Sequence, residues 1–367
     1  MFPAAAWTFD IYENYPAPRS VGSGALAPDA QLRDHPSVEN VTALGSALIA
    51  TLFLVAVTIL VGTASFHFLV WRRTNLPQGP VRTAADEQMA ALVLSCGKWS
   101  SLALLLLAGP RAVGVTLLLD NRFSLQHRLA ALILRSEWGI GLLAIVAASI
   151  VSFIGYVGVG KRRIWGWPLV MAGVALVAVG AGLQGHPADA FSKLTLAPIF
   201  DGVHAVGAGG WLGSFFVLVL AERRLVAHTA SPWTDPLGAM LERYFGASGA
   251  LAALVVITGL FSAATHLTSF DDIQGTQYGH LLAGKVGIFF ILMTFNEFHR
   301  RHAERKARTA ERPQLVHSLR FEAGLIGLIL ALSALLLDAS PPGMNEVRSE
   351  VFRVVPKGTL EMNDVDP

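Results

Sequence analysis

The sequence predicts an all-α, polytopic membrane helical bundle with about eight transmembrane helices. Hydrophobic residues make up 53% of the 367 residues and charged residues only 15%, whereas soluble domains carry roughly 25% charge. The apolar residues are gathered into runs of about 20, the length that a helix needs to cross a bilayer. Basic residues gather in alternate loops between these runs, which is the pattern of loops that face the cytoplasm.

Eight segments fit this description, and most are bounded by polar or helix-ending residues. Basic residues follow the first, third, fifth and seventh segments, and Gly185 and Pro187 suit the end of the fourth because glycine favours a helix C-terminus and proline prevents continuation. The segments are 41–70, 87–108, 137–159, 165–184, 199–220, 240–264, 280–298 and 318–338.

Segment 109–136 is partly apolar but is interrupted by charged residues, namely Arg111, Asp120, Arg122, Arg128 and Arg135. This pattern is typical of one or two amphipathic helices at the membrane surface. If the segment were a ninth span, every later helix would reverse and three basic loops would lie outside the cytoplasm, against the positive-inside rule. We therefore expect an interfacial segment.

The alternation of basic loops predicts the orientation and the division of the chain. The basic loops contain Arg72, Arg73 and Arg82; Lys161, Arg162 and Arg163; Arg223 and Arg224; and the run that begins at Arg300. The positive-inside rule places them in the cytoplasm and both termini in the periplasm. We expect a periplasmic N-terminal arm at 1–40, N-terminal helices at 41–160, a helical core at 161–338 and a periplasmic tail at 339–367.

Four histidines fall at the periplasmic end of separate helices. His186 ends the fourth segment, His204 lies near the start of the fifth, His266 follows the sixth and His280 opens the seventh. An imidazole at the edge of the hydrocarbon is costly unless it has a partner, and neutral imidazole is a common metal ligand. These residues predict a metal site at the outer mouth, although each one could instead simply hydrogen-bond a neighbouring helix.

The richest local motif is FDGVHAVGAGGWLG at 200–213. On a regular helix, Asp201, His204 and Trp211 share a face. Asp201 is therefore a candidate to hold one ring nitrogen of His204 and leave the other for a metal. Lys285, on the seventh segment, would repel a cation and is a competing partner for Asp201. The residues predicted to surround the histidine ligands are Asp201, Trp211 and Lys285.

Thioether and imidazole ligands together favour Cu(I) over harder cations. Met171 and Met293 are the methionines well inside the predicted spans, in their cytoplasmic halves. They are candidates for an inward relay, although methionines in a membrane core are usually packing residues.

Several motifs of this chain resemble the copper resistance D (CopD) family. They are GHP at 185–187, DGVHAVGAGGWLGSF at 201–215, QYGHLLAGKVGIF at 277–289 and LRFEAGLIGLILALSALLL at 319–337, together with RSEWG at 135–139. The resemblance covers roughly 90–340, so that 161–338 becomes a CopD-like core. It implies a multi-pass protein of the bacterial inner membrane that handles copper, with His186 and His204 as its first ligands, and with a periplasmic CopC-like copper-binding protein as a partner.

We therefore expect a copper-binding protein that moves copper from the periplasm toward the cytoplasm. It is not expected to be an enzyme, to hold an organic cofactor or to bind nucleic acid. Two alternatives stay open. One is a non-transporting subunit, or a copper-delivery and assembly factor, that docks on a respiratory complex in the membrane. The other is a b-type haem protein.

Overall fold

The computed structural model describes residues 36–76, 78–117, 124–185, 196–225, 236–267, 269–306 and 312–339. Within these ranges the side chains at 36–43, 81, 266, 299, 302–306, 312–318 and 338 are not described. The pattern of contacts divides the chain into two units, Met1–Val41 and Thr42–Pro367. The first turns of the first described helix belong to the first unit, and all the other described residues belong to the second.

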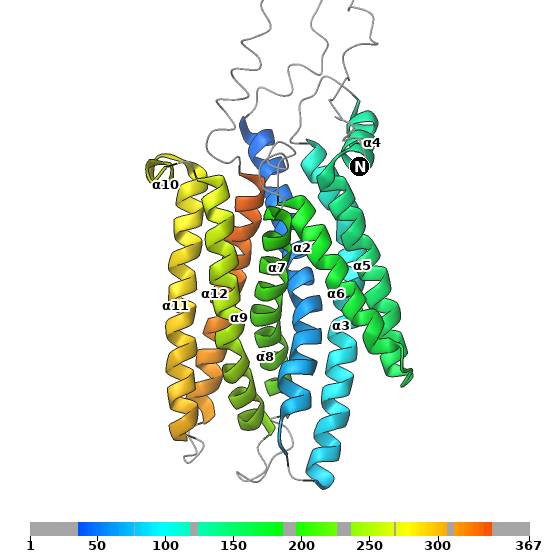
Figure 1. Ribbon diagram of the computed structural model, residues 1–367, viewed down its shortest axis with the longest axis vertical. Coiled ribbons are helices and arrows are strands. Elements are labelled where there is room, and N and C mark those ends of the chain that lie inside the picture. The colour runs from blue at the N-terminus through cyan, green and yellow to red at the C-terminus, as the bar shows by residue number, and fades with distance from the viewer. Residues whose placement is uncertain are drawn as a thin grey trace, which may run out of the picture. The chain divides into compact units, whose positions relative to one another are not determined.

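The described part of the chain is built of helices and contains no strand (Figure 1). In chain order these are α2 (Pro36–Ser65), η1 (Phe66–Val70), η2 (Trp71–Arg73), α3 (Pro80–Leu117), α4 (Leu125–Arg135), α5 (Glu137–Gly160), α6 (Gly166–Gln184), α7 (Ala197–Ala208), η4 (Gly209–Gly213), α8 (Ser214–Leu225), α9 (Pro236–His266), α10 (Asp271–Gly275), α11 (Gln277–Lys306) and α12 (Arg312–Asp338).

The prediction of eight membrane-spanning helices is confirmed. Among the described residues, eight helical stretches are long and apolar enough to cross a bilayer, and each overlaps one predicted segment. They are Leu44–Arg73, Arg82–Leu117, Glu137–Gly160, Gly166–Gln184, Ala197–Leu225, Pro236–Thr265, Gln277–Phe298 and Leu319–Leu337. The protein is therefore an all-α, multi-pass membrane bundle.

The expected surface segment at 109–136 needs a correction, because its first third belongs to the preceding span. Helix α3 continues through Pro110 to Leu117, although proline removes one helix hydrogen bond. The continued part of α3 packs against α5, the third span. Arg111 is buried, and its guanidinium lies over the Trp138 ring of α5, 5.9 Å from the ring centroid. The separate amphipathic helix is α4, which has no buried side chain.

The two ends of the bundle differ in what they carry. One end holds α10, the start of α7 and the ends of α6 and α9 (Figure 1), and we call it the His204 end. The opposite end holds basic residues of successive turns, including Arg72, Lys161 and Arg223, and we call it the arginine end.

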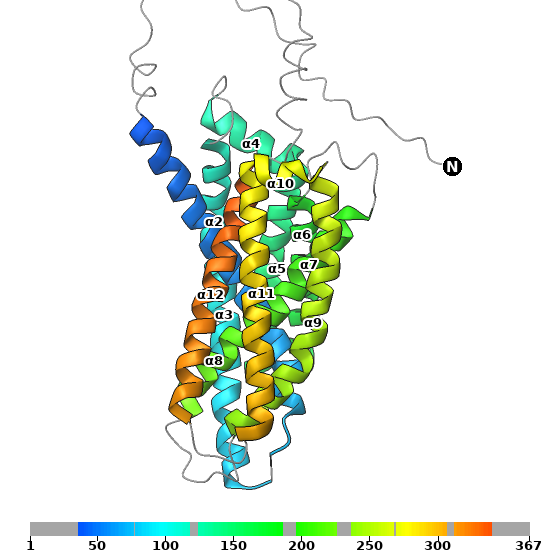
Figure 2. The ribbon, with the colours of Figure 1, turned by 90° about the vertical axis from the view of Figure 1, so that its left-hand side faces the viewer.

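Helix packing follows the chain order closely. Helix α5 packs against α3, α4 and α6, α6 packs against α7, and α7 packs against α9. Helix α11 contacts both α12 and α9, and Figure 2 shows it between them. The elements that carry the candidate site, α7, α9 and α11, are therefore close to one another.

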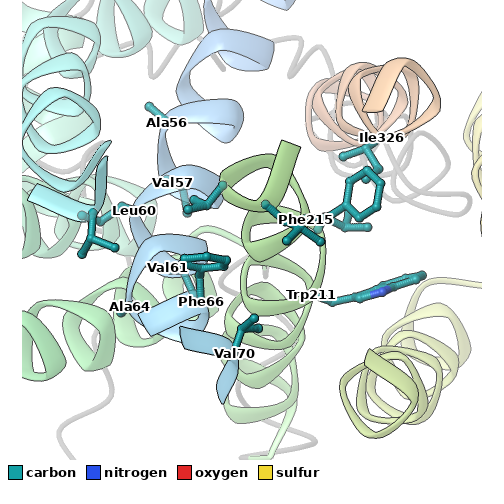
Figure 3. Packing of buried hydrophobic residues seen from close by; sticks show 14 of the residues in the cluster. Ala56, Val57, Leu60, Val61, Ala64, Phe66, Val70, Trp211, Phe215 and Ile326 are labelled. Carbon is teal, nitrogen blue, oxygen red and sulfur yellow. The ribbon is translucent and has the colours of Figure 1, made fainter. Parts of the chain in front are cut away.

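The fifth span is held tightly against the first. An added Cβ at Gly62 of α2 would lie 2.1 Å from the backbone carbon of Gly213, so these two backbones approach closely, as small residues permit in membrane bundles. The surrounding core is apolar, with Leu60 and Phe66 of the first span and Phe215 of α8 each 0% exposed (Figure 3).

Candidate metal site at the His204 end

His204 is a half-buried residue of α7 whose ring points to α9. Its Nδ1 lies 3.1 Å from the carbonyl oxygen of Val255 and 3.0 Å from Oγ1 of Thr258. The Thr258 hydroxyl itself donates to the carbonyl oxygen of Leu254 at 2.7 Å. Both groups near Nδ1 therefore accept, and Nδ1 must carry the proton.

This pairing determines what the other ring nitrogen can do. When Nδ1 of a neutral imidazole is protonated, Nε2 keeps a lone pair. A histidine that donates one ring N–H to a backbone carbonyl and binds a metal through the other nitrogen is the common arrangement at protein metal sites. In the part of the chain that the structure describes, both hydrogen bonds of the His204 ring use Nδ1, so Nε2 is the candidate ligand atom.

Gly259 makes room for the ring on α9. A Cβ at this position would lie 3.1 Å from Cε1 of His204 and 3.4 Å from Nδ1, which is closer than most side-chain contacts. The absence of a side chain at Gly259 therefore lets the imidazole lie close to α9 and reach the Val255 carbonyl.

Asp201 does not hold His204, contrary to the sequence-based expectation. Its Oδ1 accepts a hydrogen bond of 2.6 Å from the hydroxyl of Ser262 on α9, and its carboxylate packs on Gly185 at the end of α6. Asp201 also interacts electrostatically with Tyr278 and Lys285 of α11. Asp201 was expected either to hold His204 or to pair with Lys285. The structure shows the interaction with Lys285.

Lys285 is half-buried on α11, and its charge acts on His204 as well as on Asp201. An isolated ammonium group here would repel a bound cation. The nearby carboxylate offsets this repulsion, so the Asp201–Lys285 interaction lets a cation approach His204 at lower electrostatic cost.

Trp211 contacts a different helix from His204, and the helix changes its winding between the two residues. Residues Gly209–Gly213 form a π-helical turn, and the wider turn shifts the register of every residue after it. The Trp211 ring is 2% exposed and packs edge-on against Phe289 of α11, with 5.5 Å between the ring centroids. Figure 3 shows it directed away from the first span.

The other predicted histidine ligands lie toward the same end but are not brought together by described contacts. His280 is exposed at the start of α11, and its backbone N–H is bonded to the Thr276 carbonyl. His266 ends α9 and its side chain is not described, and His186 lies outside the described residues. Among the described residues, no three histidine, cysteine or acidic side chains are close enough to hold one ion. The four-histidine site therefore stays a prediction.

The two methionines are not brought together either. Met171 is 46% exposed on α6, whereas Met293 of α11 is partly buried against the core. Helices α6 and α11 lie on opposite sides of the bundle in Figure 1. A relay through both thioethers therefore gains no support from the fold.

Thr258 and Ser262 are the residues of the site that sequence reasoning missed. They are the polar residues of α9, in its half nearer the His204 end, that contact α7: Thr258 contacts His204, and Ser262 contacts Asp201. A signal was present, since they lie four residues apart in an otherwise apolar stretch and so share a helix face.

Residues 238–336 match the family model of copper resistance protein D. This part of the chain is similar to the CopD family. The CopD match contains α11 and nearly all of α9 and α12, and thus Val255, Thr258 and Lys285, whereas His204 and Asp201 precede it. It is narrower than the expected resemblance over 90–340, and the GHP and DGVHAVGAGGWLGSF motifs lie outside it.

No curated protein and no solved structure matches the chain. The CopD match and the eight spans together describe a multi-pass membrane protein related to copper resistance. The candidate site lies where α7 meets the CopD region.

Proposed function

We propose that this protein binds copper at the His204 end and passes it across the bacterial inner membrane, from the periplasm toward the cytoplasm. The CopD region supports copper as the ion. Basic residues gather at the arginine end, and basic loops favour the cytoplasmic side. This supports an orientation with the arginine end in the cytoplasm and the His204 end in the periplasm. A soluble periplasmic copper-binding protein of the CopC type is the proposed donor.

The geometry of His204 is the observation that carries the proposal. Its Nδ1–H is held by Val255 and Thr258, which leaves Nε2 as a nitrogen donor. Imidazole suits copper in both of its common oxidation states. The proposed further ligands are His280, His266 and His186. His280 and His266 lie at the His204 end of α11 and α9, and His186 follows α6 in the sequence.

The direct test is a metal-binding measurement on the purified protein and its His204→Ala variant. Cu(I) is titrated under reducing conditions against a chromogenic chelator, which reports both stoichiometry and affinity. Wild type is expected to bind copper, and the variant is expected to lose at least tenfold in affinity because its nitrogen donor is gone.

His127→Ala is the matched control. His127 is an exposed histidine of α4 and is not a proposed ligand, so this variant should bind copper like wild type. If His204→Ala also binds like wild type, the assignment of the ligand is wrong. If wild type binds no copper, the proposed function itself is wrong.

A further inference from the structure

Helix α9 carries a line of polar residues along its buried face. Between positions 244 and 262 its polar side chains are Tyr244, Ser248, Thr258 and Ser262. Their separations of 4, 10 and 4 residues keep all four on one face of a helix with 3.6 residues per turn. The line is about 27 Å long at 1.5 Å per residue, close to the ~30 Å thickness of the hydrocarbon core.

Each of these four side chains makes a hydrogen bond to a helix other than α9. At the His204 end the partners are Asp201 and His204 of α7. Toward the arginine end, Ser248 is bonded to Asn296 of α11 at 3.2 Å, and the Tyr244 hydroxyl donates to the Trp211 carbonyl oxygen at 3.5 Å. Uncharged polar groups of this kind often serve only to hold helices together.

The line ends, however, at charged groups that helix packing alone does not require. Glu322 of α12 is 2% exposed and Glu222 of α8 is 5% exposed, and both lie within spans. Buried carboxylates in a membrane are costly and usually functional. Tyr244 of α9 interacts with Glu322 electrostatically, and Arg320, two residues before Glu322 on α12, lies near Glu222 of α8.

Nη2 of Arg320 lies 3.9 Å from Oε2 of Glu222. Helix α12 packs against α8 and α11, and α11 contributes the neutral Asn296, which is buried and paired with Ser248. The polar face of α9 thus joins a histidine–aspartate site at one end to buried carboxylates at the other.

An apolar interval separates the two halves of this line. The residues of α9 between Ser248 and Thr258 are all apolar, and the interval is about 15 Å long. Proton transfer between the halves therefore requires water to bridge this interval.

We propose that the polar face of α9 is a proton path and that Glu322 holds the proton in the half near the arginine end. Hydroxyl, amide and carboxylate groups relay protons, but they are poor ligands for Cu(I), which prefers sulfur and imidazole. This inference rests on the proposed function, since it supplies the coupling ion for copper movement. Protonation makes Glu322 neutral, and loss of the proton to the aqueous side restores the carboxylate.

The test uses the full chain in sealed vesicles that contain a pH-sensitive dye. Cu(I) is added outside, and copper uptake and internal pH are followed together. Wild type is expected to move protons whenever it moves copper. Glu322→Gln, which keeps the shape of the side chain but cannot exchange the proton, is expected to lose at least tenfold in proton movement while the purified variant still binds copper at the His204 end.

Two further variants keep the test decisive. Glu242→Gln changes an exposed carboxylate at the same end of α9 and should behave like wild type. Tyr244→Phe removes only the hydroxyl next to Glu322 and should slow proton movement severalfold, which gives a second readout if Glu322→Gln does not fold.

The outcomes separate the inference from the proposed function. Copper uptake by wild type without proton movement overturns the proton path, as does proton movement in both Glu322→Gln and Tyr244→Phe at the wild-type rate. A wild type that takes up no copper overturns the proposed function, and the coupling with it.

Discussion

At the scale of single residues, the backbone of α9 determines which nitrogen of His204 can bind a metal. The Val255 carbonyl accepts the Nδ1 proton, and Thr258 accepts it as well because its own proton goes to Leu254. Groups that orient a ligating histidine in this way are typically worth 10–100-fold in metal affinity. The copper affinity of the His204 end should therefore depend on the Thr258 hydroxyl, although this hydroxyl is not a proposed ligand.

Thr258→Val tests this dependence. The variant keeps the shape of the side chain but removes the hydroxyl, while the Val255 carbonyl still holds Nδ1. We expect about a tenfold loss of copper affinity, at the low end of the range for such supporting residues, measured by competition with a chelator. Thr294→Val is the control, because Thr294 is exposed on α11 and its hydroxyl donates to the Phe290 carbonyl oxygen of the same helix. Equal losses in both variants would contradict the role of Thr258.

The sequence predicted where His204 lies along its helix, but it did not predict the partners of its ring. The position of His204 near a helix end follows from the apolar pattern alone. Its partner does not, because Asp201 lies three residues away on the same helix and looks like the natural choice, whereas the rotation of α7 directs the ring to α9. That rotation depends on Gly259 and on the packing of α7 against α9, which involves residues more than fifty positions apart.

At the scale of elements, the π-helical turn η4 lies at a close crossing of two helices. It places Gly213 against Gly62 of α2, and it turns Trp211 toward α11. π-helical turns inside α-helices are frequent at functional sites. The glycines of GAGGWLG explain the close approach, but a sequence pattern read at 3.6 residues per turn gives no sign of the wider turn or of the contact between Trp211 and Phe289.

Gly62→Ala should destabilise the protein. The added Cβ would meet the backbone of Gly213 at 2.1 Å, and backbone cannot move aside as a flexible side chain can. Overpacking of this kind typically costs ~1–3 kcal/mol, so a lower melting temperature in detergent is expected. Gly246→Ala is the control, since a Cβ there meets nothing within 4 Å and alanine favours a helix. If the two variants melted at the same temperature, the α2–η4 contact would be unimportant.

The spans were the most predictable elements, because length and hydropathy dominate in a membrane. The end of α3 was harder to predict. Pro110 and Arg111 both suggest a break, yet Arg111 is buried over Trp138, and this contact comes from packing against α5 rather than from local sequence.

At the scale of the whole molecule, the up-and-down order of the spans gives the bundle two chemically different ends. Separate helices bring candidate nitrogen donors to the His204 end, and the CopD region supplies α9 and α11 there. The topology follows from the sequence once eight spans are recognised. Convergence of the histidines does not follow, because it depends on helix rotation and on the segments next to α6 and α9, including His186, which lies outside the described residues.

Imidazole groups from more than one span are thus proposed to bind copper together at the His204 end. X-ray absorption spectroscopy of the copper-loaded protein measures the ligands directly. We expect two or more imidazole nitrogens on the copper, with one lost in His204→Ala and none lost in His127→Ala. A wild-type spectrum with only sulfur ligands, or one that His204→Ala leaves unchanged, would contradict the claim.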